Sequence, residues 1–498
     1  MSYKAPTLSV LLWLLAIPGV SATIHYVDPN SPAPTPPYTN WTVAATNIQD
    51  AVDAAGPGDL VLVTNGLYQT GGAKVNEYFT NRVAVTKLLT VQSVNGPAVS
   101  TIMGSRGNPS LGIPYVRCAY LTNGAALIGF TLTNGSVPSG SYVGGGVFSL
   151  GRPPMTPTAV VDCIITGNSA ATEGGGACGV FLDRCILTGN SSLTGGGAAY
   201  CGVNNCTICS NTASGGISYP SDEGSGGGAY NCYMTNCLIS GNSASQSGGG
   251  ICGGLICNCT IVSNTAYSGG GASLSLSRLA RLTNCIVFYN SATTSANYLS
   301  GPVFSYCCTT PLPAKVGNFT NEPGFVNPAA GDFHLQTNSP CINAGLNSAM
   351  AGSIDLDGNP RISGGAVDLG AYELPNPASI ISYAWLQKYG LPTDGSADSL
   401  DSDSDGMNNW QEWRAGTDPM NGLSVLRLSS ISITGAVATV RWQSASNVMY
   451  TLERSTNLLA QPAFLPIKTN IAGTAGTVAC PDTNLPAVGP AFYRLNVQ

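Results

Sequence analysis

The chain has 498 residues, of which only 9% are charged, while 62 are glycine and 17 are cysteine. This length exceeds that of one ordinary domain, and the apolar fraction of 43% excludes a disordered composition, so we expect several folded domains rich in turns. A formal net charge of −6 argues against a nucleic-acid partner, because such proteins carry basic patches.

Residues 1–22 have the features of a secretory signal peptide. Lys4 provides a positive start, residues 8–20 form an apolar stretch that is short for a membrane span, and residues 20–22 offer a small-residue cleavage site. An N-terminal membrane anchor is the alternative. No later stretch is long and apolar enough to cross a bilayer, so we expect a mature chain without a membrane span. We expect it to be monomeric, and secreted or attached to the cell surface.

A short helix followed by a strand is expected within residues 46–68. Asn47 is a suitable N-cap, and Ile48, Val52 and Ala55 lie on one helical face. A Gly-Pro-Gly sequence at residues 56–58 ends the helix. Such a helix can cover the open end of a stacked-repeat domain, which needs a capping unit.

A repeat dominates residues 140–312. Glycine triplets recur at intervals of 21 or 22 residues, interrupted by intervals of 30 and 31. The pattern Cys-x-[Ile/Leu/Val]-x-x-Asn-[Ser/Thr]-[Ala/Ser] holds six times. An earlier stretch fits the same frame with Gly129 at the cysteine position and Asn134 at the asparagine position. The six cysteines are Cys163, Cys185, Cys206, Cys237, Cys259 and Cys285.

This spacing predicts a parallel β-helix. A unit of about 22 residues is too short for a βαβ repeat but fits one coil of stacked strands. Cysteine and the aliphatic residue two positions later share a strand face, so both should point into the core. Asparagine suits a turn with left-handed backbone, and stacked amides can bond along the column. Cys201 and Cys209 lie outside the column and are candidates for a disulfide, while a line of cysteines disfavours a zinc cage.

One detail of the repeat has two explanations. The residues between cysteine and the inward aliphatic residue are themselves often apolar, as at Ile164, Ile186, Leu238 and Ile286. Alternation places these side chains on the outer face of the strands. Either other residues cover this outer face, or the cysteine side of the strand is not the only side that is buried.

Residues 23–312 resemble the right-handed parallel β-helix of the pectin-lyase-like superfamily. The resemblance implies an all-β solenoid, and the superfamily includes polysaccharide lyases and hydrolases as well as proteins with other roles. Lyases of this kind use an Arg or Lys base with acids that hold calcium, and hydrolases use paired carboxylates.

The β-helix offers few residues for such chemistry. Residues 115–313 contain neither Lys nor His. The candidate catalytic acids are Glu173, Asp222 and Glu223, which precede glycine triplets two coils apart and would be roughly 10 Å apart in a regular stack. Turn and structural roles for these acids are the favoured alternative. Tyr200 and Tyr230 fall at similar offsets and are candidates for stacking on sugars.

Residues 313–375 are expected to end the β-helix. The stretches GDFHLQTNSPCINAG, DLDGNPRI and VDLGAYE resemble the choice-of-anchor Q segment of secreted bacterial proteins, which implies export to the surface. The acids Asp355, Asp357, Asp368 and Glu373 either hold a cation or cap turns and pair with Arg361. The second explanation is favoured, because Asx-turns account for Asp-x-Asp-Gly equally well.

Residues 376–422 carry a stretch that fits an EF-hand calcium loop. Acidic or amide residues stand at loop positions 1, 3, 5, 9 and 12, with Gly406 at position 6 for the sharp turn and a backbone carbonyl at position 7. A solvated acidic turn is the alternative. The stretch resembles dockerin and thrombospondin type-3 modules, although a dockerin has two loops and only one is evident here. The expected Ca²⁺ ligands are Asp401, Asp403, Asp405, Met407, Asn409 and Glu412.

Residues 423–498 alternate apolar and polar residues in short stretches, which predicts a small β-sandwich. VRWQS, YTLERSTNL and AFYRL resemble fibronectin-III-like modules at the C-terminus of secreted bacterial proteins. Taken together, the sequence favours a secreted, non-catalytic β-helix protein with a calcium-stabilised linker and an extracellular polysaccharide as candidate partner. The alternatives are a polysaccharide lyase or glycoside hydrolase, and an adhesin that binds a protein.

Overall fold

The computed structural model describes residues 22–75, 80–122, 124–138, 143–150, 158–215, 222–275, 280–350, 352–446, 448–486 and 489–497. The expected signal peptide, apart from Ala22, lies outside these residues. No helix in the described part of the chain is long and apolar enough to cross a membrane. The chain divides into two compact units, the first comprising residues 1–336, 344–363 and 367–375, and the second residues 337–343, 364–366 and 376–498.

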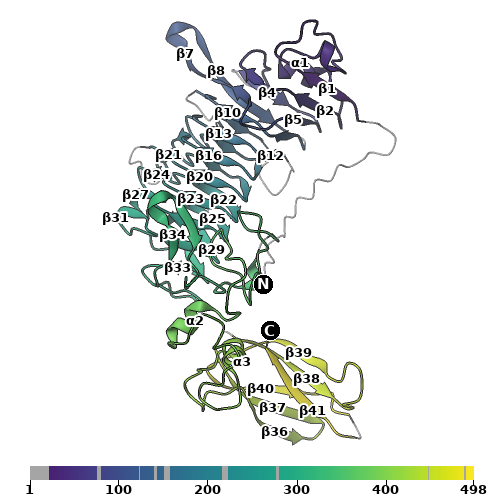
Figure 1. Cartoon of the computed structure of the whole chain (residues 1–498), viewed down its shortest axis with the longest axis vertical. Coiled ribbons are helices and arrows are strands. Elements are labelled where there is room, and N and C mark those ends of the chain that lie inside the picture. The colour runs from purple at the N-terminus through teal and green to yellow at the C-terminus, as the bar shows by residue number, and fades with distance from the viewer. Residues whose placement is uncertain are drawn as a thin grey trace. The chain divides into compact units, whose positions relative to one another are not determined.

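The first unit is a parallel β-helix built from three long sheets, whose strands stack in chain order in Figure 1. The second sheet contains β3 (Gly66–Tyr68), β6 (Ser100–Met103), β10 (Thr131–Thr133), β13 (Ile164–Thr166), β16 (Ile186–Thr188), β20 (Thr207–Cys209), β23 (Leu238–Ser240), β26 (Thr260–Val262), β30 (Ile286–Phe288) and β33 (Cys308–Thr309). The third sheet contains β17 (Ser191–Ser192), β21 (Thr212–Ala213), β24 (Ser243–Ala244), β27 (Thr265–Ser268) and β31 (Ser291–Thr294).

The first sheet has 18 strands and begins at the N-terminal end of the stack. It contains β1 (Ile24–Val27), β2 (Leu60–Val63), β4 (Thr80–Val85), β5 (Thr90–Ser93), β7 (Ser105–Asn108), β8 (Ile113–Leu121), β9 (Ala126–Ile128), β11 (Val147–Phe148), β12 (Ala159–Val161), β14 (Ala177–Cys178), β15 (Phe181–Asp183), β18 (Ala198–Ala199), β19 (Gly202–Asn204), β22 (Ala229–Thr235), β25 (Ile251–Cys257), β28 (Ala272–Ser273), β29 (Ala280–Thr283) and β32 (Val303–Ser305).

The expected N-terminal helix is present as α1 (Ile48–Ala54). The Asn47 side chain accepts a hydrogen bond from the amide of Asp50, which caps the helix. Ile48, Val52 and Ala55 are all buried, as the spacing predicted. Gln49 bonds both backbone groups of Ala84 on β4 and so joins the helix to the first sheet.

The register of the second sheet places every predicted inward residue in the core. Ile165 pairs with Leu187 and Leu187 with Ile208, and all three are fully buried. The six predicted column cysteines are at most 1% exposed, and Cys307 extends the column by one coil. Burial raises the pKa of thiols such as Cys285 well above its usual value, so the column is built from neutral, apolar side chains.

The frame predicted for the coil at residues 129–136 is wrong by one residue. Leu132 pairs with Ile165, which places Phe130 opposite Cys163 and Gly135 opposite Asn168. Gly129 and Asn134 therefore precede the two column positions. Phe130 is fully buried, so an aromatic ring fills the core of this coil where later coils carry a cysteine.

The expected disulfide is also wrong. Every one of the 17 cysteines, all of which lie in described residues, is a free thiol. Cys201 is fully buried in the core, with its amide directed at the sulfur of Cys232 in the next coil at 3.4 Å, whereas Cys209 lies on β20 and is partly exposed. Cys201 thus extends the hydrophobic packing inside the solenoid, because a thiol is a small apolar side chain.

A continuous ladder of asparagine side chains runs along the repeat. Both the amide and the side-chain nitrogen of Asn190 donate to the side-chain oxygen of Asn211, at 3.0 and 2.9 Å. The left-handed backbone conformation is adopted by the residue before each asparagine of the repeat pattern, as at Ser210 with φ 56°. The asparagines are therefore explained by their side-chain hydrogen bonds and not by a need for left-handed backbone. The ladder comprises Asn168, Asn190, Asn211, Asn242, Asn264, Asn290 and Asn297.

The glycine triplets lie where neighbouring coils approach too closely for a side chain. A Cβ atom added at Gly196 would meet the carbonyl oxygen of Thr212 at 2.4 Å and that of Gly227 at 2.6 Å. The first glycine of the same triplet, Gly195, has φ +65°, which other residues adopt at a cost. The triplets are therefore steric requirements of the stack.

The outer face of the second sheet is covered in some coils and open in others. A return segment, residues 344–363 and 367–375, bonds to three successive coils: Leu346 to Asn284, Ala349 to Cys257, and Ile354 to Asn236. Ile286 is fully buried on this face, whereas Ile186 is 43% exposed. Coverage by the return segment explains the apolar outer positions of the later coils.

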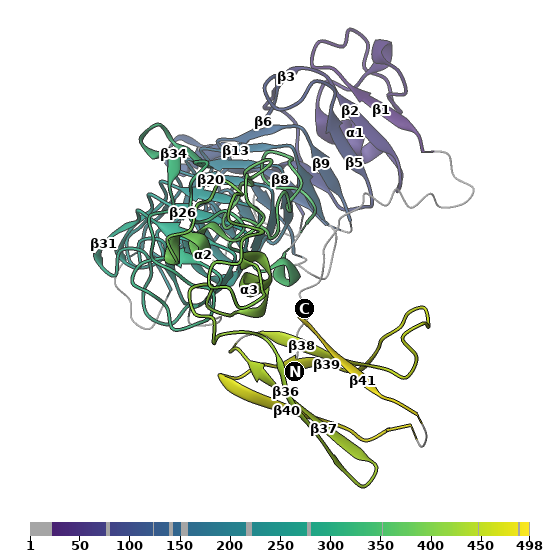
Figure 2. The same cartoon turned by 60° about the horizontal axis from the view of Figure 1, so that its bottom comes forward.

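The second unit contains two short helices and a β-sandwich (Figure 2). The helices are α2 (Tyr383–Lys388) and α3 (Asn409–Ala415). One three-stranded sheet has the order β36-β37-β40 and the other the order β39-β38-β41, with Trp442 and Tyr450 fully buried between them. The strands are β36 (Leu428–Thr434), β37 (Val437–Ser444), β38 (Met449–Ser455), β39 (Leu465–Ala472), β40 (Gly476–Asp482) and β41 (Phe492–Val497).

Candidate functional site

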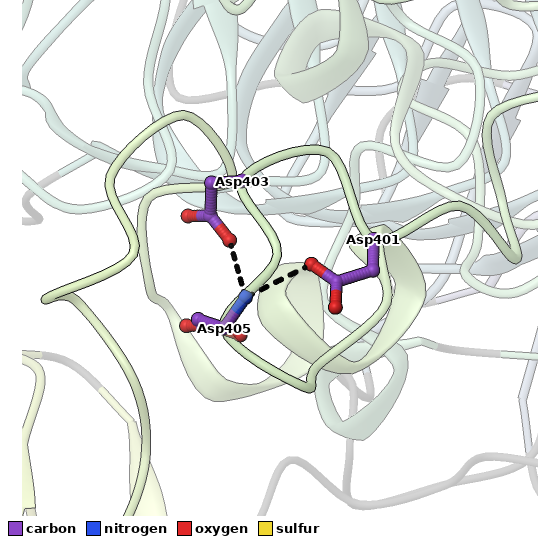
Figure 3. A group of neighbouring side chains, drawn as sticks. All are labelled: Asp401, Asp403 and Asp405. Atoms are coloured by element: carbon purple, nitrogen blue, oxygen red, sulfur yellow. Dashed lines mark hydrogen bonds between the residues drawn. The ribbon is translucent and has the colours of Figure 1, made fainter.

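Three aspartates of the predicted calcium loop converge in the structure (Figure 3). Carboxylate oxygens of Asp401, Asp403 and Asp405 lie within 4.8 Å of one another. Gly406 has φ +97°, so the sharp turn at loop position 6 uses the conformational freedom of glycine. In the described part of the chain, this is the group of three acidic, histidine or cysteine side chains close enough to share one metal ion.

Backbone hydrogen bonds hold each aspartate in place. Asp401 accepts from the amides of Ser404, Asp405 and Gly406, at 2.7–3.2 Å. The amide of Asp405 also bonds Asp403, as Figure 3 shows. Asp405 in turn accepts from the amide of Met407 at 2.8 Å. The loop is thus formed by its own backbone, which fixes the carboxylates without help from distant residues.

Glu412 reaches this site from the first turn of α3. The helix begins with a capping box, in which Asn408 and Gln411 exchange side-chain and backbone hydrogen bonds, and it ends at Gly416 with φ 70°. Glu412 is fully buried, and one of its oxygens accepts from the hydroxyl of Thr417 at 3.3 Å. Burial, followed by the charges of neighbouring aspartates, raises the pKa of Glu412 to about 7.

Three buried carboxylate oxygens at the loop have no hydrogen-bond partner among the described residues. They are one oxygen each of Asp403, Asp405 and Glu412. A buried, unpaired carboxylate oxygen is costly, and carboxylate oxygens are the ligands that Ca²⁺ prefers. The donor set therefore fits a hard divalent cation held by the carboxylates of Asp401, Asp403 and Asp405, with Glu412 close enough to respond to their charge.

The structure gives less direct support for two predicted calcium ligands, Asn409 and Met407. The Asn409 side chain donates to the carbonyl of Ala397 at 2.9 Å and accepts from the hydroxyl of Ser402 at 3.0 Å, so its amide already has two partners. Loop position 9 of EF-hands often acts through a water molecule, which is compatible with this arrangement. Met407 follows the sharp turn, at the position that supplies a carbonyl in such loops.

Sequence reasoning did not include Thr417. Its hydroxyl holds Glu412, and the Gly-Thr-Asp-Pro stretch after the loop was the available signal. Thr417 is itself buried. It therefore orients the carboxylate at loop position 12 without being a ligand in the predicted loop pattern.

Two candidate catalytic acids of the β-helix, Glu173 and Asp222, accept hydrogen bonds from tyrosine hydroxyls. The hydroxyl of Tyr200 donates to Glu173 at 2.9 Å, and that of Tyr230 donates to Asp222 at 2.6 Å. The two rings contact each other edge to face, with centroids 5.5 Å apart. Glu173 and Asp222 thus belong to one chain of contacts across neighbouring coils, while Glu223 lies next to Asp222 and is partly exposed.

Three of the four acids predicted in the return segment, Asp355, Asp368 and Glu373, lie in a buried cluster, whereas Asp357 is exposed and its carboxylate lies 2.6 Å from the Nε2 atom of His334. Arg361, only 1% exposed, forms an ion pair with Glu373 at 3.2 Å and donates to the carbonyls of Asp368 and Gly370. Asp355 accepts from three backbone amides at 2.7–3.0 Å, as in an Asx-turn. This geometry favours the turn-capping explanation for these residues over a cation site.

The chain matches no family model and no curated protein. Among solved structures it is similar to pectate lyase Pel9A, with 17% identity, a TM-score of 0.44, and coverage of 71% of this chain and 97% of the lyase. It is also similar to a rhamnogalacturonan lyase, with 11% identity, a TM-score of 0.33, and coverage of 61% and 91% respectively. The parallel β-helix follows from the strand pairing described above and does not depend on these similarities.

Proposed function

We propose that this chain is an extracellular, non-catalytic β-helix protein whose loop at residues 401–412 binds Ca²⁺. The observation that carries the proposal is the set of buried, unpartnered oxygens of Asp403, Asp405 and Glu412. Asp401 completes the acidic set, the carbonyl of Met407 supplies a further oxygen, and Asn409 acts through water. The ion neutralises a crowded group of carboxylates and so stiffens the module that precedes the β-sandwich.

Calcium binding is tested by calorimetry and thermal unfolding of the full chain. We expect a dissociation constant of order 0.1–1 mM, typical of extracellular modules. At a hundredfold excess over this constant, Ca²⁺ should stabilise the second unit by about 2.7 kcal/mol. Affinity should be higher at pH 8 than at pH 6, because Ca²⁺ displaces a proton from Glu412, whose pKa is about 7 without the ion.

Two matched substitutions distinguish loss of a calcium ligand from the general effect of removing a negative charge. Asp403→Asn removes a ligand and should abolish the heat of binding, whereas Asp394→Asn, which changes an aspartate outside the loop bonded to Ser396, should leave it unchanged. Absence of heat with the unmodified chain, or equal loss of affinity in both variants, would contradict the calcium proposal.

A polysaccharide is the partner that we propose for the β-helix. Tyr200 carries this proposal, because its partly exposed ring lies beside the Glu173 carboxylate and so suits stacking and hydrogen bonding to sugars, while Tyr230 is only 5% exposed and supports that ring from the core side. The same residues favour the second candidate function, a polysaccharide lyase or glycoside hydrolase that uses Glu173 with Asp222 or Glu223. In the non-catalytic proposal, the tyrosine hydroxyls use these carboxylates as structural acceptors.

A polysaccharide panel distinguishes binding from catalysis. We expect the chain to be retarded in gels that contain a bound polysaccharide, with no release of unsaturated or reducing sugar from any panel member. Sugar release would overturn the non-catalytic proposal. If release were seen and Glu173→Gln with Asp222→Asn abolished it, the acids would be catalytic. Glu322→Gln is the matched control, since Glu322 also accepts from a tyrosine hydroxyl, that of Tyr289.

A further inference from the structure

One side of the β-sandwich ends in an exposed edge strand, β36. All seven residues of β36 are exposed, and within the described part of the chain the strand pairs with β37 alone. It carries no charge, proline or glycine: its sequence is Leu-Ser-Ser-Ile-Ser-Ile-Thr. Soluble proteins usually protect such edges with lysine, proline or a bulge, because free ladder groups pair with other strands. A bulge-like register shift lies between Leu428 and Ser430, and from Ser430 to Thr434 the pairing of β36 with β37 is regular, so this stretch remains open to a further strand.

The inner layer of the sandwich is incomplete next to this edge. Ile431 is paired with Val440 and Ile433 with Ala438, and both partners are fully buried. Ile431 and Ile433 are nevertheless 49% and 68% exposed. Residues of one sheet face point the same way, so these two isoleucines belong to the core layer but are not covered by the opposing sheet.

A surface cavity of about 220 Å³ lies at this open side. None of its lining residues carries a charge, so an anionic or cationic ligand finds no partner there. Both β36 and β41 contribute to it, which means that an edge strand of each sheet borders the opening. The lining residues are Ile431, Ile433, Ala438, Leu485, Pro486, Gly489, Ala491 and Tyr493.

The residue pattern of β36 is complementary to itself in an antiparallel pair. With Ser432 on a twofold axis, Ile431 of one copy stands opposite Ile433 of the other on the inner face. Ser430 then stands opposite Thr434, and hydroxyl side chains meet on the outer face. Directly opposed residues must share a face, so this register joins isoleucine to isoleucine without burying a charge.

We propose that two copies of this chain associate through antiparallel pairing of their β36 strands. The pairing makes one continuous six-stranded sheet and supplies free ladder groups of each strand with partners. The isoleucines of the second copy cover the exposed inner layer of the first. The dimer replaces the monomer that we expected from the sequence. It is independent of the calcium and polysaccharide proposals, which concern other residues.

The oligomeric state of the full chain tests this proposal. In sedimentation or light-scattering measurements, the weight-average mass should rise from 50.8 kDa toward twice that value as concentration increases. Ile433→Lys should weaken association at least tenfold, because it places an ammonium group in the apolar layer. Leu459→Lys makes a similar change at a 90% exposed residue away from β36 and should associate like the unmodified chain.

Cross-linking tests the register. Ser432→Cys places two thiols opposite each other at the twofold axis, so mild oxidation should give a covalent dimer. Ser430→Cys places its two thiols about 13 Å apart along the strands and should not. A chain that stays monomeric at all concentrations, an Ile433→Lys variant that associates normally, or cross-linking by Ser430→Cys in preference to Ser432→Cys would overturn the proposal.

Discussion

Asn211→Asp should destabilise the β-helix by roughly 3–5 kcal/mol, as expected for an uncompensated buried charge. The Asn211 side chain is fully buried and donates to the carbonyls of Leu187 and Cys209 and to the side-chain oxygen of Asn242, at 2.9–3.0 Å. In the variant, a negatively charged carboxylate oxygen would face these three acceptor oxygens and repel them. Guanidinium unfolding followed by circular dichroism measures the loss.

The pH dependence distinguishes charge from shape in this variant. A buried aspartate has a pKa raised above its unfolded value of about 3.9, so the variant loses stability as pH rises above that value and recovers part of it at pH 4. Asn65→Asp is the matched control, because Asn65 is exposed and its side-chain oxygen can still accept from Asn95. Equal stability of the two variants at pH 7 would contradict the ladder as described.

Arg361→Met should also cost about 3–5 kcal/mol, because it removes the cation that lies among the buried acids Asp355, Asp368 and Glu373. Arg361 contacts Glu373 at 3.2 Å, and Asp355 and Asp368 are each only 1% exposed in the same cluster. The return segment that contains this cluster covers the outer face of three coils. We therefore expect loss of Arg361 to loosen the segment and expose Ile286, which hydrogen exchange can measure.

The pH profile of the same variant is a second readout. Burial, followed by repulsion from Asp368, raises the pKa of Glu373 to about 9, and Arg361 opposes this rise. The pKa of Glu373 is therefore higher in the folded than in the unfolded chain. As pH rises from about 4.5 to 9, the free energy of unfolding should fall, because the unfolded chain loses this proton first. Arg361→Met should extend that fall to higher pH, whereas Glu373→Gln should flatten it.

Arg281→Met is the control for loss of a positive charge at an arginine that is exposed on β29. Its unfolding free energy should stay within about 0.5 kcal/mol of the unmodified chain, as for most surface substitutions. An Arg361→Met variant that behaves like this control would show that the cluster does not hold the return segment.

The repeat made the solenoid predictable from sequence. Cysteine and aliphatic residues at a spacing of two, recurring every 21 or 22 residues, placed Cys206 and Ile208 in the core, and both are fully buried. The frame error at Gly129 arose because that coil has phenylalanine in place of cysteine, so the side chain that marks the column was missing. Strand register resolves this, since Leu132 pairs with Ile165.

The acidic loop was predictable for a similar reason. The predicted ligands lie within twelve consecutive residues, and a local loop brings Asp401, Asp403 and Asp405 together whatever the rest of the chain does. The tyrosine partner of Glu173 was not predictable, because Tyr200 comes from the next coil, 27 residues later, whereas Tyr230 lies only 8 residues after Asp222 and around the same glycine triplet. Insertions between coils obscure which residues become neighbours.

The sequence by itself determined the period of the coils, their inward residues and the acidic loop, because each depends on spacing within a single unit. Only the tertiary structure decided which outer faces are covered, that Cys201 and Cys209 stay unpaired, and that β36 is left as an open edge. Coverage of the outer faces depends on residues far apart in the chain, such as Asn236 and Ile354, which are 118 positions apart. Periodicity identifies the buried side of a strand, whereas contacts at long range decide what lies against its other side.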